Sequence, residues 1–139
     1  MQQLERITVA LIAFLVEDNK TIRDQLIPTL EELTNARVLG AAETELEAVH
    51  WMTTHDGMWD IAVVDMFLKE GSGLGVLRGC KDRKPHQRVV ILSNYATPDI
   101  RAQCLALGAD AIFDKSTELE ALFQFMGSMP GNGPATSSS

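Results

Sequence analysis

The sequence contains few cysteines and few basic residues, and each shortage excludes a class of protein. Its 139 residues include two cysteines, Cys80 and Cys104, which are too few for a disulfide-stabilised scaffold. Neither belongs to a C-x-x-C pair, so both are expected to be reduced, which indicates a cytoplasmic protein. The 12 lysines and arginines are outnumbered by 19 aspartates and glutamates, which gives a formal net charge of −7. This balance argues against nucleic-acid binding, which needs a basic surface for the phosphates.

Long apolar runs are also missing. The longest spans residues 7–16, is interrupted only by Thr8, and is shorter than the roughly 20 residues that cross a bilayer. It ends directly in Glu17 and Asp18, without the small-residue cleavage site of a signal peptide. The run therefore predicts a buried strand, and we expect no membrane contact.

Strand and helix signals alternate along the chain, which predicts an α/β fold. Each of five apolar runs is followed by a segment of helical periodicity, and the second helical segment opens with a capping box of Thr44 and Glu47. The runs span residues 7–16, 36–42, 61–64, 88–92 and 111–114. Five such units imply a parallel sheet with helices on both faces.

Residues 127–139 differ in composition from the rest of the chain. They read GSMPGNGPATSSS, which is rich in Gly, Pro and Ser and has no apolar periodicity. We therefore expect one folded domain over residues 1–126 and a flexible tail over residues 127–139.

Polar side chains follow four of the five predicted strands. Glu17 and Asp18 follow the first strand, and Asp65 follows the third. Ser93 follows the fourth strand, and Lys115 follows the fifth. Because ligands of open parallel sheets bind at the carboxyl ends of the strands, we expect these side chains to meet at one edge. Three carboxylates that close together repel one another, and a bound Mg²⁺, which prefers oxygen ligands, relieves that repulsion.

With such a cation bound, the charges of the three carboxylates, the cation and Lys115 cancel. A neutral site admits a phosphoryl group, which the cation, Lys115 and the Ser93 hydroxyl would contact. A carboxylate can itself be the nucleophile and form an aspartyl-phosphate. Asp65 is the expected nucleophile, because it ends the most uniformly apolar strand at the centre of the sheet.

Four segments together resemble the receiver domain of two-component response regulators. They read LVEDN, VVDMFLKEGSGLGVL, VVILSNY and GADAIFDKS. The resemblance covers residues 10–126 and implies a flavodoxin-like (βα)₅ three-layer sandwich with strand order 2-1-3-4-5. It also implies that Asp65 is the phosphoacceptor and that Glu17 and Asp18 are the acidic pair that holds Mg²⁺. Phe67, two residues after the phosphoacceptor, would lend its main-chain carbonyl to the metal.

The remaining roles come from the same resemblance. Ser93 matches the hydroxyl that turns toward the phosphoryl group, and Lys115 matches the lysine that pairs with it. Together with Asp65 they form the expected catalytic set. Three positions depart from the family pattern. Ile112 stands at the switch position, where an aromatic ring is usual, Ser116 follows Lys115 where proline is common, and Lys69 stands where proline is frequent.

The resemblance implies a phosphorelay protein. A sensor histidine kinase or a phosphotransfer protein would phosphorylate Asp65, and phosphorylation would change the binding of an unknown downstream protein. Such a chain is a signalling phosphoacceptor and not a metabolic enzyme, since it catalyses only its own phosphorylation and dephosphorylation. The sequence is compatible with a monomer and with a homodimer.

Three other functions fit the same fold less well. A pseudo-receiver would bind a partner without phosphorylation; Ile112 favours this interpretation, and the intact set of acids disfavours it. A phosphatase with an aspartate nucleophile normally carries a second acid two residues later, where this chain has Phe67. A flavin-binding protein is disfavoured because the loop after the first strand is acidic.

Two large side chains lie beside the expected site. Phe67 and Tyr95 each follow a site residue, Asp65 or Ser93, by two positions. If both rings block the approach of water, autodephosphorylation is slow. In the alternative interpretation, both rings merely pack against the adjacent loop.

Overall fold

In the computed structural model, which describes residues 6–130 and 135–138, five parallel strands form the central sheet. They are β2 (Leu11–Val16), β3 (Ala36–Ala42), β4 (Ile61–Asp65), β5 (Arg88–Ser93) and β6 (Ala111–Asp114). The spatial order is β3-β2-β4-β5-β6, which is 2-1-3-4-5 when these five strands are numbered along the chain. The predicted flavodoxin-like fold is therefore confirmed.

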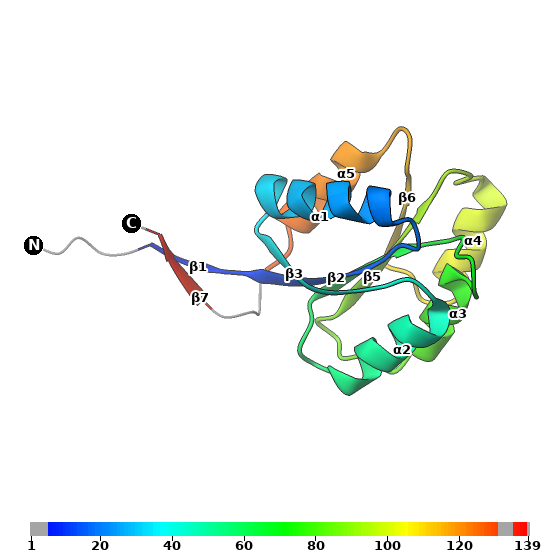
Figure 1. Cartoon of the computed structure of the whole chain (residues 1–139), viewed down its shortest axis with the longest axis horizontal. Helices are drawn as coiled ribbons and strands as arrows, with labels where there is room; N and C mark the ends of the chain where they lie inside the picture. The colour runs from blue at the N-terminus through cyan, green and yellow to red at the C-terminus, as the bar shows by residue number, and fades with distance from the viewer. Residues whose placement is uncertain (1–5, 131–134, 139) are drawn as a thin grey trace, which may run out of the picture.

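Helices cover both faces of this sheet (Figure 1). On one face lie α1 (Lys20–Leu33) and α5 (Leu119–Gly127), and on the other lie α2 (Glu45–Thr54), α3 (Gly73–Gly79) and α4 (Pro98–Ala106). Alternate residues of β2 enter the two cores, with Leu15 on the side of α1 and α5 and Phe14 on the opposite side. Because both faces are covered, the strands are apolar at consecutive positions.

The helix starts follow the polar residues of the sequence. Thr44 Oγ1 accepts the N–H of Glu47, and Glu47 Oε1 accepts the N–H of Glu43, so the predicted capping box is formed with a shift of one residue in its second bond. Two predicted helix boundaries differ from the structure. The Lys84-Pro85 pair predicts the end of the third helix, but α3 already ends at Gly79. The polar residues Ser116 and Thr117 predict the start of the last helix, but α5 begins at Leu119.

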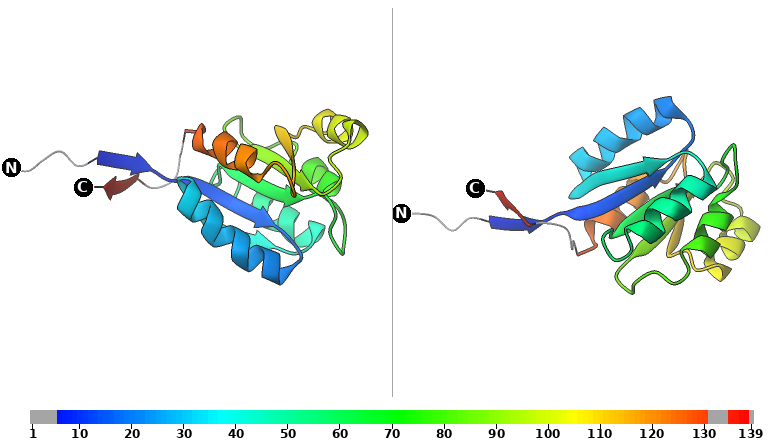
Figure 2. Two further views of the ribbon diagram at one scale, coloured as in Figure 1. Left: turned by 90° about the horizontal axis from the view of Figure 1, so that it is seen from above. Right: turned by 60° about the horizontal axis from the view of Figure 1, so that its bottom comes forward.

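The apolar run at residues 7–16 is not one strand, as the sequence predicts, but two. Only β2 joins the central sheet, while β1 (Arg6–Val9) pairs antiparallel with β7 (Ala135–Ser138). These two strands extend away from the helices as a ribbon (Figures 1 and 2).

Parts of two elements lie within residues 127–139, the segment expected to be a flexible tail. α5 continues through Gly127, and β7 lies near the end of the chain. Residues 131–134 and 139 of this segment lie outside the described residues. An extended strand presents unpaired N–H and C=O groups, and pairing with a second strand satisfies them in spite of an unfavourable composition.

Both cysteines are buried and free, as predicted from their spacing. Among the residues that the structure describes, no helix is long and apolar enough to cross a membrane.

Candidate functional site

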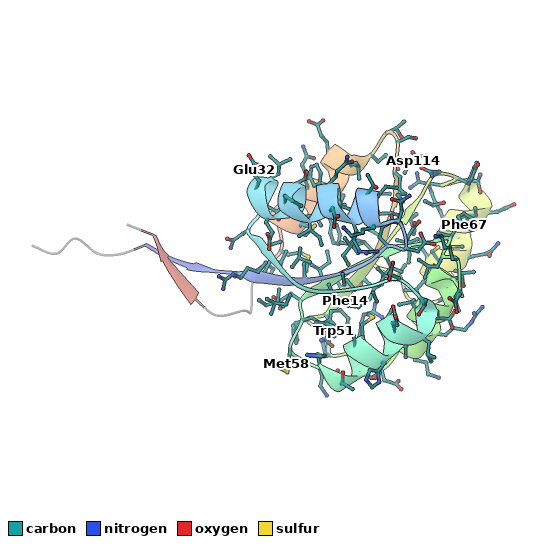
Figure 3. All side chains as sticks on the ribbon, in the orientation of Figure 1. Phe14, Glu32, Trp51, Met58, Phe67 and Asp114 are labelled. Carbon is teal, nitrogen blue, oxygen red and sulfur yellow. The ribbon has the colours of Figure 1, made fainter. Side chains whose placement is uncertain are left out.

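The carboxyl ends of four strands bring the predicted site residues to one edge of the sheet. Glu17 directly follows β2, Asp65 and Ser93 are the last residues of β4 and β5, and Lys115 directly follows β6. This edge lies at the end of the molecule opposite β1 and β7, where Phe67 and Asp114 are labelled in Figure 3. The parallel sheet is the reason for this convergence, because all of its strands end on the same side.

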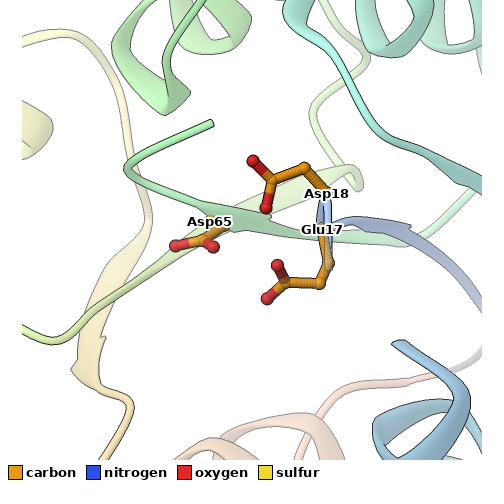
Figure 4. A group of neighbouring side chains, drawn as sticks. All are labelled: Glu17, Asp18 and Asp65. Carbon is orange, nitrogen blue, oxygen red and sulfur yellow. The ribbon is translucent and has the colours of Figure 1, made fainter. Parts of the chain in front are cut away.

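Three carboxylates form a cluster at this edge (Figure 4). Glu17, Asp18 and Asp65 each offer one oxygen, and these oxygens lie within 4.8 Å of one another. Glu17 and Asp65 are buried, whereas Asp18 is partly exposed. Oxygen donors at this spacing suit a hard divalent cation such as Mg²⁺.

Lys115 joins two of these carboxylates. Its Nζ lies 2.7 Å from Glu17 Oε1 and 3.1 Å from Asp65 Oδ2. Burial raises the pKa of Asp65, Lys115 opposes this effect and Glu17 adds to it, so that the pKa stands at about 6. Burial lowers the pKa of Lys115, but the two carboxylates outweigh it and raise that pKa above its ordinary value. Lys115 therefore stays protonated beside Asp65.

Main-chain groups of the neighbouring loops hold the acidic pair. The N–H of Asn19 donates to Glu17 Oε2 at 3.0 Å, and the side chain of Asn19 caps α1 by accepting the N–H of Ile22. The N–H of Lys69 donates to Asp18 Oδ2 at 2.6 Å. The start of α1 and the β4–α3 loop thus fix the positions of Glu17 and Asp18.

Ser93 is fully buried beneath this edge. Its Oγ accepts the N–H of Tyr95 at 3.0 Å, and its carbonyl accepts the N–H of Lys115 at 3.0 Å. The first bond ties the hydroxyl to the β5–α4 loop, and the second ties the strand to the residue that carries the site ammonium. The structure therefore brings the predicted polar residues together at one edge.

This arrangement matches a known family. The family model of the response regulator receiver domain matches residues 13–126. The chain belongs to this family. The resemblance found in its sequence motifs is thereby confirmed.

Similar proteins include a curated relative and solved structures. The DNA-binding transcriptional activator DevR/DosR of Mycobacterium tuberculosis is 29% identical over 96 residues, which are 69% of this chain and 43% of that protein. The chain thus spans less than half of the length of this relative. The CheX-CheY-BeF₃-Mg⁺² complex from Borrelia burgdorferi has a TM-score of 0.74 and 20% identity, over 84% of this chain and 86% of that chain. A response regulator protein from Burkholderia pseudomallei, solved with a phosphorylated aspartic acid, a calcium ion and citrate, has a TM-score of 0.70 and 23% identity, over 85% of this chain and 67% of that chain. These two likenesses support the fold.

Two aromatic side chains flank the acidic cluster of this receiver domain. The rings of Phe67 and Tyr95 lie edge to face, with centroids 6.2 Å apart and an interplanar angle of 78°. Phe67 is 54% exposed and Tyr95 is 66% exposed. The two rings therefore join the loops that follow β4 and β5, and they leave much of their surface to solvent.

Ile112, which stands at the expected switch position, has a polar neighbour that sequence reasoning missed. Ile112 is buried, and its carbonyl accepts a hydrogen bond from the Arg101 guanidinium at 3.1 Å. The same guanidinium donates to the carbonyl of Ala96 at 2.9 Å and to Glu118 Oε1 at 2.7 Å. Arg101 thus links the β5–α4 loop, β6 and the start of α5. Two of its three acceptors are main-chain carbonyls, which residue identities do not encode.

Proposed function

We propose that this chain is a phosphoacceptor that receives a phosphoryl group on Asp65 from a histidine kinase or a phosphotransfer protein. The observation that carries the proposal is the position of the Lys115 ammonium between Glu17 and Asp65, with Asp18 beside them. A buried acid that contacts an ammonium and has two further carboxylates beside it has the parts that phosphoryl transfer needs. The chain acts on no other substrate in this proposal.

The transfer is a nucleophilic displacement at phosphorus. An Asp65 carboxylate oxygen forms the new P–O bond while the P–N bond to the donor histidine breaks, and that electron pair stays on the imidazole nitrogen. The attacking carboxylate must be ionised, and the Lys115 ammonium favours the ionised form against the effect of burial.

Glu17, Asp18 and Asp65 are the residues that would hold Mg²⁺, together with the main-chain carbonyl of Phe67. Mg²⁺, when bound, supplies positive charge that stabilises the phosphoryl oxygens during transfer. The three carboxylate oxygens fit this role in number and in chemistry. Lys115, which lies between Glu17 and Asp65, would contribute a second positive charge.

Ser93 would transmit the effect of Asp65 phosphorylation from the site to the protein surface. Its Oγ has a proton to donate, and a phosphoryl oxygen on Asp65 would accept it. Movement of Ser93 toward Asp65 would also move the β5–α4 loop, because the N–H of Tyr95 donates to Ser93 Oγ. That loop also contains Ala96, whose carbonyl accepts from Arg101, so the movement would reach β6 and α5.

An interaction module that works without phosphorylation is the second candidate. It is favoured by Ile112, which has no ring to bury or expose. The acidic cluster opposes this candidate, because three carboxylates close together are costly unless a cation joins them. The cytoplasmic location, the absence of nucleic-acid contacts and the partners named here remain predictions.

Intact mass measurement tests the proposal. The full chain is incubated with Mg²⁺ and acetyl phosphate, and Asp65→Ala is compared with Asp99→Ala, which removes an exposed acid of α4 outside the cluster. We expect one phosphoryl adduct in the wild type and in Asp99→Ala, and none in Asp65→Ala or after chelation of Mg²⁺. If no adduct forms in the wild type with acetyl phosphate or with phosphorylated histidine donors, the interaction module is the better interpretation.

A further inference from the structure

The β4–α3 loop contributes a main-chain donor to the acidic cluster. The N–H of Lys69 donates to Asp18 Oδ2 with an N···O distance of 2.6 Å. The two residues are 51 positions apart in the sequence and belong to different loops. Proline has no N–H, so this bond requires another residue type at position 69.

The loop is shaped to present this donor. Phe67 and Ser72 form an isolated antiparallel bridge, which folds the segment between them back on itself. Gly71 supports the turn with a φ of 85°, a conformation that glycine adopts readily. Lys69 lies between Phe67 and Ser72, so the bridge constrains the backbone before and after it.

Glu45, in the first turn of α2, anchors the same loop to this helix through two hydrogen bonds. Its N–H donates to the carbonyl of Glu70 at 3.1 Å, and its Oε1 accepts the N–H of Ser72 at 3.0 Å. The donor at Lys69 therefore belongs to an anchored turn. A donor held in this way loses little conformational freedom when it binds Asp18.

A carboxylate has two oxygens and several lone pairs, so a bond to one N–H leaves room for a cation. Hydrogen bonds to a metal-binding carboxylate orient it and fix its place among the other ligands. We propose that the Lys69 main-chain N–H is a positioning group for divalent cation binding, because it holds the Asp18 carboxylate beside Glu17 and Asp65. The inference rests on the metal site of the proposed function and adds a residue to it.

The Lys69 side chain must be separated from its N–H in any test. Lys69 is exposed, and its positive charge repels a cation at the nearby acidic cluster. Removal of the side chain therefore changes the affinity for Mg²⁺ even when the N–H is kept. Lys69→Ala removes the charge and keeps the N–H, whereas Lys69→Pro removes both. The two variants differ in the hydrogen bond and in the backbone freedom that proline removes at positions 68 and 69, so the amide resonance of Lys69 is measured as well.

Isothermal titration calorimetry with Mg²⁺ alone, in the absence of any phosphodonor, measures the effect. We expect Lys69→Pro to bind Mg²⁺ about tenfold more weakly than Lys69→Ala, since loss of a group that orients a metal ligand typically costs about 10- to 100-fold in affinity. Equal affinities, or tighter binding by Lys69→Pro, would overturn the inference. If the wild type and Lys69→Ala bind no Mg²⁺, the metal site of the proposed function is contradicted. If both bind Mg²⁺ and Lys69→Pro binds it equally well, only the role of the Lys69 N–H is contradicted.

A second measurement serves if Lys69→Pro does not fold. In the wild type, we expect the amide proton resonance of Lys69 to lie downfield and to move when Mg²⁺ is added, and Asp18→Ala to shift it upfield. A Lys69 resonance that is the same in the wild type and in Asp18→Ala would show that the bond is not formed, and would overturn the inference.

Discussion

Asp65 is subject to opposing influences from its surroundings. Burial and Glu17 favour the neutral acid, while the Lys115 ammonium, 3.1 Å from Asp65 Oδ2, favours the carboxylate. The result is a pKa of about 6, above the ordinary value of 3.8. In the metal-free protein the Asp65 carboxyl is therefore ionised mainly above pH 6.

This raised pKa has a consequence for stability. The folded protein holds the Asp65 proton more tightly than the unfolded chain does, so the ionised carboxyl destabilises the fold above pH 6 and ceases to do so as the pH falls toward 3.8. The penalty is at most about 3 kcal/mol at pH 8, and it is smaller to the extent that water screens the carboxylate.

Asp65→Asn should therefore be more stable than the wild type at alkaline pH. The amide keeps the shape of the side chain and cannot ionise, so we expect its free energy of unfolding at pH 8 to exceed that of the wild type by about 1–3 kcal/mol. At pH 5 the difference should fall to roughly half. Urea denaturation of both proteins at the two pH values, with chelator present, measures it. A difference that does not change between pH 8 and pH 5 would show that the Asp65 carboxyl is not the cause.

Phe67 and Tyr95 offer a second test at the scale of residues. Their edge-to-face contact fits both interpretations, rings that shield a phosphoryl group from water and rings that pack against the adjacent loop. Phe67→Asn keeps the main-chain carbonyl and removes the ring, so we expect faster hydrolysis of phosphorylated Asp65. The half-life after removal of the donor, followed by intact mass, reports this rate. Leu46→Asn, a change at an exposed position of α2, is the matched control. An unchanged half-life in Phe67→Asn would exclude shielding by this ring.

Contact between α3 and β4 fixes the position of Asp65, the proposed phosphoacceptor. Gly73, the first residue of α3, has room for no side chain, because an added Cβ would lie 2.8 Å from the carbonyl oxygen of Asp65 and 3.0 Å from Met66 Cα. Both of these are backbone atoms of the strand that carries Asp65. The helix thus packs directly against the end of β4.

Gly73→Ala should disturb both stability and phosphorylation. Overpacking of this kind typically costs about 1–3 kcal/mol, and the backbone shift should displace Asp65 from Lys115. Denaturant unfolding and the rate of phosphorylation by acetyl phosphate give the two readouts. Gly127→Ala, in α5, is the control, since its Cβ would meet no atom within 4 Å. A Gly73→Ala protein with wild-type stability and rate would contradict the close packing.

The helices and strands near the site could be predicted because their signals are local. Residues 36–42 and 111–114 form the predicted strands without any change of bounds, and Thr44 caps α2. The start of α5 was predicted less accurately, since Glu118 at the start of this helix makes no capping hydrogen bond with its side chain. When a helix has no side-chain cap, no capping residue in the sequence indicates where it begins.

At the scale of the whole molecule, the sheet order and the convergence of the acids followed from the alternation of strands and helices. The pairing of β1 with β7 did not, because it joins residues near the two ends of the chain, and nothing in the composition of residues 135–138 indicates a strand. The bonds from Lys69 to Asp18 and from Arg101 to Ile112 were missed for a related reason. Each involves a main-chain group, and every residue type has a carbonyl while all but proline have an N–H.

The position of the phosphoryl group is the most direct measurement of the central claim. The chain is phosphorylated with acetyl phosphate and Mg²⁺, the acyl phosphate is reduced with borohydride, and the modified residue is located by peptide mass spectrometry. The account predicts modification at Asp65 alone, dependent on Mg²⁺. Modification at Glu17, at Asp18 or at an acid outside the cluster would contradict it.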